Sequence, residues 1–336
     1  MTDMQSGYYT TRNPIGLDGD FITAPEVSQM FGELLGLWCV VSWRQLGAPT
    51  PFNLIELGPG RGTLMNDLFR SALVDPEFCN SAELHFVEIG SKLRESQKSM
   101  LGERSIIWHN DINSLPSGAS IILANEFFDV LPIKQYQLTA KGWCERKVDF
   151  VEGEFRLILD DTLTTFVRKG VVGDIFERAL ERELHMSIIA GQLREYGGAA
   201  LIIDYGYSKS TNGDTLQAVR KQKAEPEFAN PGLADLTSHV DFESLVRVVD
   251  GVKTFGPTTQ RDFLLRLGIE ARSVILKQNA TSTEARDIAI AYNRLVDKCQ
   301  MGELFKVLAL SSHDVAIPPG FEHLHIGLNK NKNVIL

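Results

Sequence analysis

The chain has 336 residues, of which 43% are hydrophobic and 23% charged; this is the composition of a globular protein with one enlarged domain or two, and it excludes a disordered chain. A net charge of −9 argues against a nucleic-acid-binding protein with a basic surface and fits a cationic ligand or substrate. Four cysteines, scattered without C-x-x-C spacing, indicate neither a disulfide framework nor a metal site.

Residues 1–51 are expected to form a loop followed by a helix. Residues 1–24 lack periodicity, and Pro25 and Glu26 then open one long helical pattern that ends near Gly47. The N-terminus shows no secretory signal, and the apolar stretch from Leu34 to Trp43 is half the length of a membrane span. We therefore expect no stable membrane insertion and a cytoplasmic protein.

From residue 53 onward, β-rich runs alternate with helix-like segments, at 53–57, 83–89, 105–109 and 120–126, which predicts a parallel sheet with crossover helices. Residues 134–160 alternate with period two, as antiparallel strands do. A helix is expected from about Asp174 to Tyr196, followed by an apolar strand. Residues 207–240 are polar and predicted to be irregular. A helix from about Asp241, a strand at 252–256, two helices over 259–300 and a closing strand at 304–312 follow.

The loop after the first strand is glycine-rich, and it predicts a nucleotide-like ligand because glycine lets the backbone approach a ligand closely. The candidate cofactor-binding residues in this loop are Glu56, Gly58, Gly60 and Gly62. No Gly-Lys-Ser/Thr triplet follows, which excludes a phosphate-binding Walker loop. Thr63 occupies the place of the third glycine of the dinucleotide fingerprint, which disfavours a nicotinamide oxidoreductase. S-adenosylmethionine remains as the common ligand of such a loop.

Two further acids follow the next strands, in the order that this cofactor requires. Glu88, after the second strand, is suited to accept hydrogen bonds from two ribose hydroxyls; the alternative is an exposed strand-end carboxylate. Asp111, with Asn110 beside it after the third strand, is suited to the adenine amino group; the alternative is a helix or turn cap.

The fourth strand ends in Asn125, Glu126 and Asp129, where the substrate nucleophile is expected, since reacting atoms lie beyond the carboxyl ends of parallel strands. Paired carboxylates suit a guanidinium and can accept its proton; alternatively they cap the following turn. Phe127 and Phe128 are expected to be walls of the substrate site.

Three further residues are expected to bind the substrate. Asp204 and Tyr205 follow the fifth strand, although Tyr205 fits the core equally well. His239 is either a substrate contact or a hydrogen-bonded structural histidine.

Seven stretches resemble the MidA-type family, which includes the mitochondrial methyltransferase that assists assembly of respiratory complex I. They read GYYTTRNPIGLDGDFITAPEVSQMFGELLG, IELGPGRGTLMNDL, LANEFFDVLP, LIIDYGY, GDTLQAV, GLADLTSHVDF and MGELFKVLAL, and the resemblance covers nearly the whole chain. It implies an α/β, class I S-adenosylmethionine-dependent methyltransferase fold: a Rossmann-like, mostly parallel sheet with an antiparallel last strand, inserted segments and an N-terminal helical cap. Residues 1–51 would then be a lid loop and helix, and 52–336 the methyltransferase domain, with insertions at about 134–173 and 207–240, the latter a substrate rim.

The resemblance also implies the activity: type II, symmetric dimethylation of an arginine in the 49-kDa-type (NuoD-type) subunit of NADH dehydrogenase, in the mitochondrial matrix if the source is eukaryotic. Carried over by position, the family's glycine loop, ribose acid and substrate-side acids fall on residues already named: Gly58, Gly60, Gly62, Glu88, Asn125, Glu126 and Asp129. The stretch from Gly19 to Glu26, with Thr23 and Pro25, is expected to close over the cofactor.

Two features depart from the family pattern. The chain begins almost at the GYY motif, where family members usually have a preceding helical segment, and Gly90-Ser91 stands where they usually have Ser-Pro or Asn-Pro, which predicts a looser helix start after Glu88. A cofactor-binding assembly chaperone without turnover and a small-molecule methyltransferase remain open as alternatives. The sequence does not give the oligomeric state.

Overall fold

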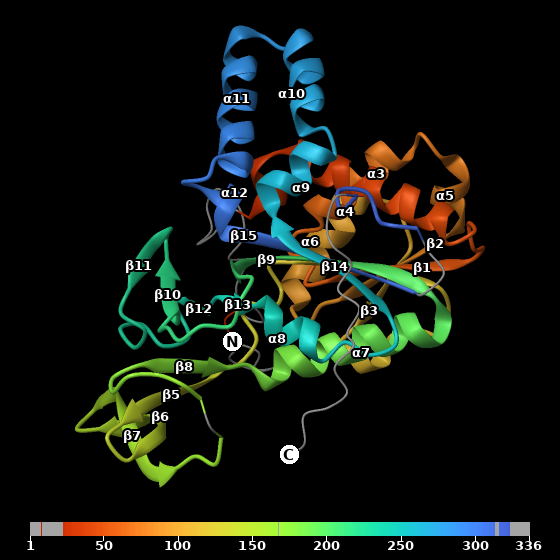
Figure 1. Cartoon of the computed structure of the whole chain (residues 1–336). Helices are drawn as coiled ribbons and strands as arrows, with labels where there is room; N and C mark the ends of the chain where they lie inside the picture. Colours follow the sequence, from red (N-terminus) through yellow and green to blue (C-terminus); the bar gives the residue numbers. More distant parts are fainter. Residues whose placement is uncertain (1–7, 9–22, 167, 313–315, 323–336) are drawn as a thin grey trace.

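The computed structural model describes Tyr8 and residues 23–166, 168–312 and 316–322. Its main sheet has eight strands, seven of them in the order β14-β15-β9-β4-β1-β2-β3, with the short β13 beside β9 (Figure 1). Their bounds are β1 (Phe52–Leu57), β2 (Ala82–Val87), β3 (Ile106–His109), β4 (Ser120–Asn125), β9 (Gly198–Tyr207), β13 (Val240–Asp241), β14 (Lys253–Thr259) and β15 (Phe305–Ser311). β3, β2, β1, β4 and β9 pair in parallel, whereas β15 runs antiparallel between β9 and β14. The predicted fold class, with its antiparallel last strand, is confirmed.

Helices cover both faces of this sheet because successive strand residues point to opposite sides. In β1, Leu54 packs into one core with helices α3 (Gln29–Gln45) and α4 (Thr63–Ala72), while Ile55 and Leu57 pack into a second core with α7 (Leu180–Tyr196) and α8 (Phe242–Arg247). Helices α5 (Pro76–Ser81) and α6 (Ser91–Leu101) complete the crossovers around β2. The glycine loop and the other strand ends are therefore held on a rigid layer.

Two predicted helices begin or divide differently from the expectation. The helix expected from Pro25 to Gly47 is two helices, α2 (Ala24–Val27) and α3, because Ser28 is extended and its side chain accepts a hydrogen bond from Met30 N, which caps α3. The helix expected from Asp174 begins only at Leu180, since residues 175–178 form strand β8 (Ile175–Arg178). That strand pairs with β5 and brings Phe176 against Tyr136, so tertiary pairing overrides local propensity.

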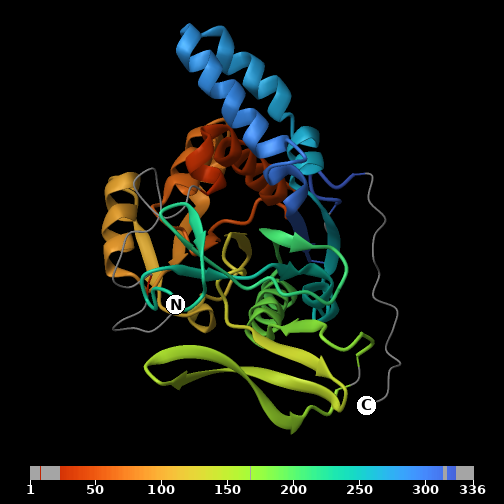
Figure 2. The same cartoon turned by 90° about the vertical axis from the view of Figure 1, so that its left-hand side faces the viewer.

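The chain leaves the main sheet twice, each time at a strand end, and forms a smaller sheet. The first consists of β5 (Lys134–Thr139), β6 (Gly142–Val151), β7 (Glu154–Leu163) and β8, all antiparallel, where the period-two alternation predicts strands. The second consists of β10 (Gln217–Arg220), β11 (Lys223–Glu225) and β12 (Asp235–Thr237). Both lie at the left in Figure 1, the side that faces the viewer in Figure 2.

The second sheet corrects the expectation that residues 207–240 are irregular. Its strands are three and four residues long, too short to produce a visible alternation, and they form because β10 pairs with both neighbours.

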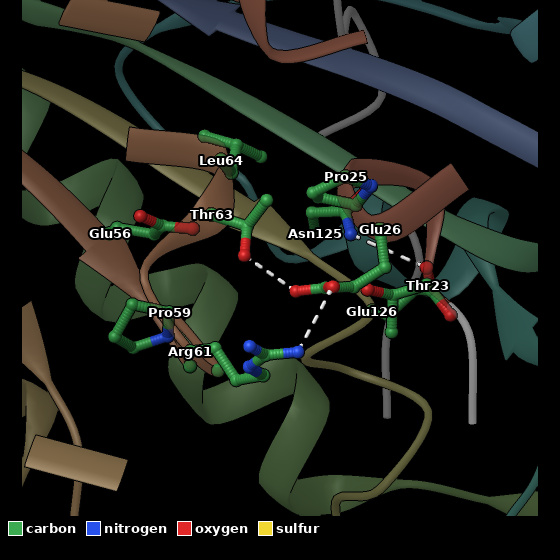
Figure 3. Close-up of a pocket in the computed structure, with 12 residues that line it drawn as sticks. Thr23, Pro25, Glu26, Glu56, Pro59, Arg61, Thr63, Leu64, Asn125 and Glu126 are labelled. Atoms are coloured by element: carbon green, nitrogen blue, oxygen red, sulfur yellow. Dashed lines mark hydrogen bonds and ion pairs between the residues drawn. The ribbon is translucent and has the colours of Figure 1, made fainter. Parts of the chain in front are cut away.

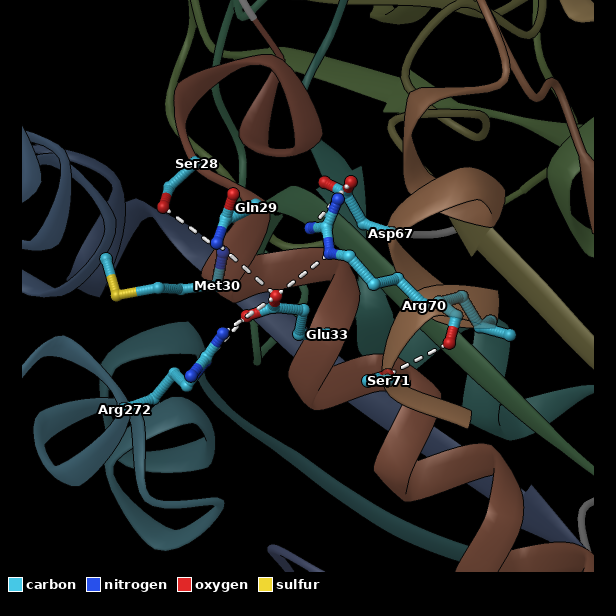
Figure 4. Close-up of polar contacts among 9 residues, drawn as sticks. Ser28, Gln29, Met30, Glu33, Asp67, Arg70, Ser71 and Arg272 are labelled. Carbon is cyan, nitrogen blue, oxygen red and sulfur yellow. Dashed lines mark hydrogen bonds and ion pairs between the residues drawn. The ribbon is translucent and has the colours of Figure 1, made fainter. Parts of the chain in front are cut away.

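The chain between β14 and β15 holds α9 (Gln260–Arg266), α10 (Ile269–Gln278), α11 (Ser282–Val296) and α12 (Met301–Leu304), more helices than the two predicted. α10 and α11 form a hairpin that projects from the body (Figure 1). Its base is joined to α3 by Glu33, a buried carboxylate that accepts hydrogen bonds from Arg272 of α10 at 2.7 and 3.0 Å and from Arg70 of α4 at 3.2 Å (Figure 4). Glu33 thus ties three helices together.

Candidate active site

A cavity of about 770 Å³ lies at the carboxyl ends of the parallel strands. Its walls come from the glycine loop, the ends of β2 and β3, the turn after β4, α7 and the sheet of β10–β12. Six carboxylate side chains line it: Glu88, Asp111, Glu126, Asp129, Glu181 and Asp235. None of the described lining residues is Lys or Arg. This composition favours a cationic occupant and disfavours a phosphate-bearing one.

The glycine loop forms one wall. Gly58 and Gly60 line the cavity, both with positive φ, at 64° and 53°. A Cβ on Gly58 would lie 3.0 Å from the ring of Phe127, so only glycine fits there without displacing that ring. Gly62, in contrast, lines neither this cavity nor the smaller one described below. It is the N-cap of α4 with φ 86°, where it shapes the turn, and its contact with the cofactor stays a prediction.

The acid after β2 lies as predicted at the cavity wall. Glu88 is only 6% exposed; it accepts hydrogen bonds from Gly90 N at 2.7 Å and Gln97 Nε2 at 3.3 Å. Burial raises the pKa of Glu88 to about 7, although these two bonds oppose the shift. Gly90 begins α6 without a side-chain cap, as the departure from the family pattern predicts.

The acid after β3 is a turn cap that also lies at the cavity wall, while its contact with an adenine stays a prediction. Asp111 lines the cavity and also caps a short 3-10 helix (Ile112–Ser114), where Asn113 N donates to its carboxylate at 2.6 Å and thereby lowers its pKa. Asn110 lines the cavity beside it. Arg94 donates to Asn110 Oδ1 at 2.6 Å and to the carbonyl of Glu88 at 2.9 Å, so it holds the ends of β2 and β3 in register.

Glu126 stands at the centre of the site, between the two cavities. Its φ of 50° is in the left-handed region, which costs a non-glycine residue about 1–2 kcal/mol. One carboxylate oxygen accepts hydrogen bonds from Ala24 N at 3.1 Å and Asn125 Nδ2 at 3.4 Å. Burial, and next the charge of Asp129, raise the pKa of Glu126 to about 7. A strained residue with a shifted pKa in a cavity is a strong candidate for function.

Asp129 is the second acid of this turn, 4% exposed and at the cavity wall. Its Oδ2 accepts a hydrogen bond from the hydroxyl of Tyr205, which also lines the cavity. Its Oδ1 is buried and has no hydrogen-bond partner among the described residues. Burial raises the pKa of Asp129. An unpaired buried oxygen is costly in the free protein and is available to a donor that enters the cavity.

Of the other residues predicted to bind the substrate, some line the cavity and some do not. Phe127 lines the cavity, but Phe128 and Asp204 are fully buried and line neither cavity, so the expectation that they contact a substrate is wrong. Phe128 points into the core beside α7. The Asp204 carboxylate accepts hydrogen bonds from the backbone N of Phe128 at 3.0 Å and of Asp129 at 3.2 Å, and thus holds the turn that carries the acids. His239 lies outside both cavity walls, with its ring edge-on to that of Tyr205.

A second cavity of about 50 Å³ adjoins the first, because both are lined by Thr23, Gly58, Gly60 and Glu126. Figure 3 shows its lining, which includes Pro25, Glu26, Glu56 and Asn125. Glu56 is 3% exposed, its Oε2 has no hydrogen-bond partner among the described residues, and burial raises its pKa to about 8. Thr23 and Pro25 are thus at the site as expected, whereas residues 19–22 of the same stretch lie outside the described residues.

Sequence reasoning missed the lining residues that come from α7 and from the β10–β12 sheet. These are Glu181 and His185 of α7 and Gln217, Val219, Asp235 and Thr237 of the small sheet. Gln217, Val219, Asp235 and Thr237 lie in two of the stretches that resemble the family, GDTLQAV and GLADLTSHVDF, in the segment expected as a substrate rim, but they were not singled out. Glu181 and His185 lie in no such stretch, and only the fold brings them to the cavity.

Over the described ranges, no group of three or more His, Cys, Asp or Glu side chains is placed to hold a metal ion. In the same part of the chain, no helix has the length and apolarity needed to cross a membrane.

Comparison with known proteins gives consistent results. Residues 34–258 match the model of a family of S-adenosyl-L-methionine-dependent methyltransferases. The chain is 36% identical to the mitochondrial protein arginine methyltransferase NDUFAF7 of Xenopus tropicalis, over 96% of this chain and 84% of that protein. It is 34% identical to NDUFAF7 of Homo sapiens, over 93% and 78% of the two chains.

A solved structure shares the fold. A Burkholderia thailandensis protein, crystallised with S-adenosyl-homocysteine, has 24% identity and a TM-score of 0.79, over 96% of this chain and 88% of that one.

Proposed function

The chain belongs to this family of S-adenosyl-L-methionine-dependent methyltransferases, and from that premise we propose that it methylates an arginine side chain of a protein. The observation that carries the proposal is the composition of the large cavity. The glycine loop and Glu88 line one part of this cavity, Glu126 and Asp129 line another, and none of the described lining residues is Lys or Arg. A cationic acceptor fits such a cavity, and a guanidinium is the planar cation that paired carboxylates bind best.

The residues present fit the cofactor of the family. Gly58 and Gly60 line the cavity, so a ligand can approach the backbone of the glycine loop, and the Glu88 carboxylate would accept hydrogen bonds from the ribose hydroxyls. Asp111 and Asn110 would bind the adenine, and Glu56 lies below the loop at the small cavity. The acidic lining, without a described Lys or Arg, suits a sulfonium and offers nothing for a phosphate. When bound, S-adenosyl-L-methionine supplies an electrophilic methyl group.

The chain's own residues would then orient the acceptor and take its proton. The unpaired Oδ1 of Asp129 and the carboxylate of Glu126 offer acceptors for guanidinium N–H groups. Tyr205 fixes Asp129 through its hydroxyl, and Asp204 fixes the backbone of the turn. With a pKa of about 7, Glu126 can bind at its carboxylate the proton that the methylated nitrogen loses, more readily than an ordinary glutamate can.

The finer proposal concerns the substrate. We infer symmetric dimethylation of an arginine in the 49-kDa-type subunit of NADH dehydrogenase. It is supported by relatives that are named protein arginine methyltransferases and by the β10–β12 sheet, which lines the cavity with Gln217, Val219, Asp235 and Thr237. The relatives are labelled mitochondrial. A chain of this family would meet that subunit in the mitochondrial matrix, or in the cytoplasm of a bacterium.

The test is transfer of labelled methyl groups from S-adenosyl-L-methionine to the recombinant 49-kDa-type subunit, with the site and symmetry of methylation read by mass spectrometry. Glu126→Gln keeps the shape of the side chain and removes the charge. We expect kcat to fall roughly 10²–10⁴-fold, with the Kd for S-adenosylhomocysteine within about twofold. Glu195→Gln, an exposed carboxylate on α7, is the matched control and should leave both unchanged.

Three outcomes would contradict parts of the proposal. Undiminished methyl transfer by Glu126→Gln would refute the proposal that Glu126 and Asp129 bind the guanidinium and that Glu126 takes its proton. Cofactor binding without transfer to any protein or small molecule would favour an assembly chaperone. Transfer to arginine in a different protein would refute only the substrate.

A further inference from the structure

The short helix α2 is connected to two parts of the site through different atoms. Glu26 Oε1 accepts a hydrogen bond from Thr63 Oγ1 at 2.5 Å, and its Oε2 lies 3.4 Å from Arg61 Nη1, so the carboxylate grips the end of the glycine loop (Figure 3). Two residues earlier, Ala24 N donates to the carboxylate of Glu126 at 3.1 Å. One four-residue helix thus touches both the loop proposed to hold the cofactor and the acid proposed to receive the proton.

α2 cannot hold this position by its own stability. A helix of one turn is far below the length at which isolated helices form, so its place depends on outside contacts. Glu26 supplies two such contacts, to Thr63 and to Arg61, from a side chain that is only 15% exposed.

We propose that Glu26 is a positioning residue for methyl transfer: its carboxylate fixes α2 to Thr63 and Arg61 of the glycine loop and thereby sets the place of Glu126 through Ala24 N. The part of this proposal that concerns Glu126 rests on the proposed function. The part that concerns the glycine loop rests only on binding of S-adenosyl-L-methionine by members of this family. Glu26 contacts neither reacting atom in this scheme. It acts through the two elements that it joins.

The structure allows the two contacts of Glu26 to be removed separately. Glu26→Ala removes both; Glu26→Gln retains an acceptor for the Thr63 hydroxyl and loses the charge facing Arg61. Thr63→Val removes the hydroxyl from the other side, and Thr63→Ser restores it. Glu95→Gln, an exposed carboxylate on α6, is the control.

Titration calorimetry with S-adenosylhomocysteine is the main readout, since it needs no methyl acceptor. We expect Glu26→Ala to weaken binding roughly tenfold, as for loss of a charge-assisted hydrogen bond, and Glu26→Gln to weaken it less. Thr63→Val should weaken binding and Thr63→Ser should recover it. The double variant Glu26→Ala/Thr63→Val should bind no worse than Glu26→Ala alone, because Glu26→Ala already removes the contact with Thr63.

Two further readouts separate positioning from plain stability. In the cofactor-free protein, amide exchange at residues 26–28 should accelerate in Glu26→Ala, because the amides of Glu26, Val27 and Ser28 bond within α2. In methyl transfer, kcat should fall together with the rise in KM for the cofactor. Binding of S-adenosylhomocysteine by Glu26→Ala within twofold of the unaltered protein, or additive losses in the double variant, would overturn the inference. Neither result depends on whether the substrate is an arginine.

Discussion

Ionisation of the Glu56 carboxyl is expected to lower the stability of the free protein at neutral pH. The carboxyl is 3% exposed at the base of the glycine loop, and burial raises its pKa from 4.5 to about 8. An acid whose pKa rises on folding holds its proton more tightly in the folded state. Stability from this group is therefore fully present below pH 4.5 and is lost as the pH rises toward 8.

The size of the effect follows from the same two values. Each pH unit between 4.5 and the folded pKa corresponds to about 1.4 kcal/mol, so at pH 7 the cost is about 3 kcal/mol and at pH 8 about 4 kcal/mol. Glu56→Gln removes the ionisation and keeps the side-chain shape. Relative to the unaltered protein, we expect Glu56→Gln to gain about 3–4 kcal/mol in free energy of unfolding as the pH rises from 5 to 8.

Urea unfolding of both proteins at pH 5, 6, 7 and 8 measures this difference. Comparing the change with pH, instead of the value at one pH, removes any packing effect of the amide. Glu83→Gln, an exposed glutamate on β2, is the control and should show no such trend. A difference between Glu56→Gln and the unaltered protein that is the same at pH 5 and pH 8 would refute the raised pKa. We also expect S-adenosylhomocysteine to bind Glu56→Gln more weakly, because a residue kept at a cost to stability is kept for binding or catalysis.

Glu88→Gln should weaken S-adenosylhomocysteine binding by roughly ten- to a hundredfold in calorimetry, as for loss of a charged hydrogen-bond acceptor, and unchanged affinity would rule out the ribose role. Tyr205→Phe removes the hydroxyl that donates to Asp129, so we expect kcat to fall roughly tenfold or more with the Kd for S-adenosylhomocysteine unchanged; equal kcat would show that Asp129 needs no such support. Glu33→Ala removes the carboxylate that binds Arg272 and one of the two that bind Arg70, which keeps Asp67, and it should lower the free energy of unfolding by about 1–3 kcal/mol in urea. A loss of cofactor binding alone would contradict a purely structural role.

The main sheet was predictable because its signal is repeated. Each parallel strand is a short apolar run followed by a helical segment, and the strand order then follows from the fold class. The predictions that were wrong concern short elements outside the main sheet. Ile175–Arg178 shows no alternation of its own and becomes a strand by pairing with β5. The three strands between residues 217 and 237 are shorter than the run of alternating residues that would reveal a strand in the sequence.

The site was predictable where a residue lies at the end of a parallel strand. Glu88, Asp111, Glu126 and Asp129 all do, and all line one cavity. Within a turn the direction of a side chain is not encoded by position, and so Phe128, beside Glu126 and Asp129, points into the core while Phe127 faces the cavity. Glu181 and His185 of α7 carry no signal until the fold is known. The family-like stretch GLADLTSHVDF marks the segment that holds Asp235, but it does not tell which of its side chains reach the cavity.

The raised pKa values of Glu56, Glu88 and Glu126 bear on how an acidic site accommodates a ligand whose sulfur is cationic before methyl transfer and neutral after it. Each carboxyl is buried, so each strongly disfavours charge unless a cation lies near. A sulfonium or a guanidinium in the cavity favours the ionised acids, and the acids in turn favour those cations. Methyl transfer would leave the sulfur neutral, while the methylated guanidinium would stay cationic and release one proton. An acid whose pKa lies near 7, such as Glu126, can take up that proton, so that the loss of the sulfonium charge is matched by the loss of one negative charge. Carboxylates with ordinary pKa values would stay ionised at neutral pH, and the walls of the large cavity hold no described Lys or Arg to balance the charges of Glu88 and Glu126.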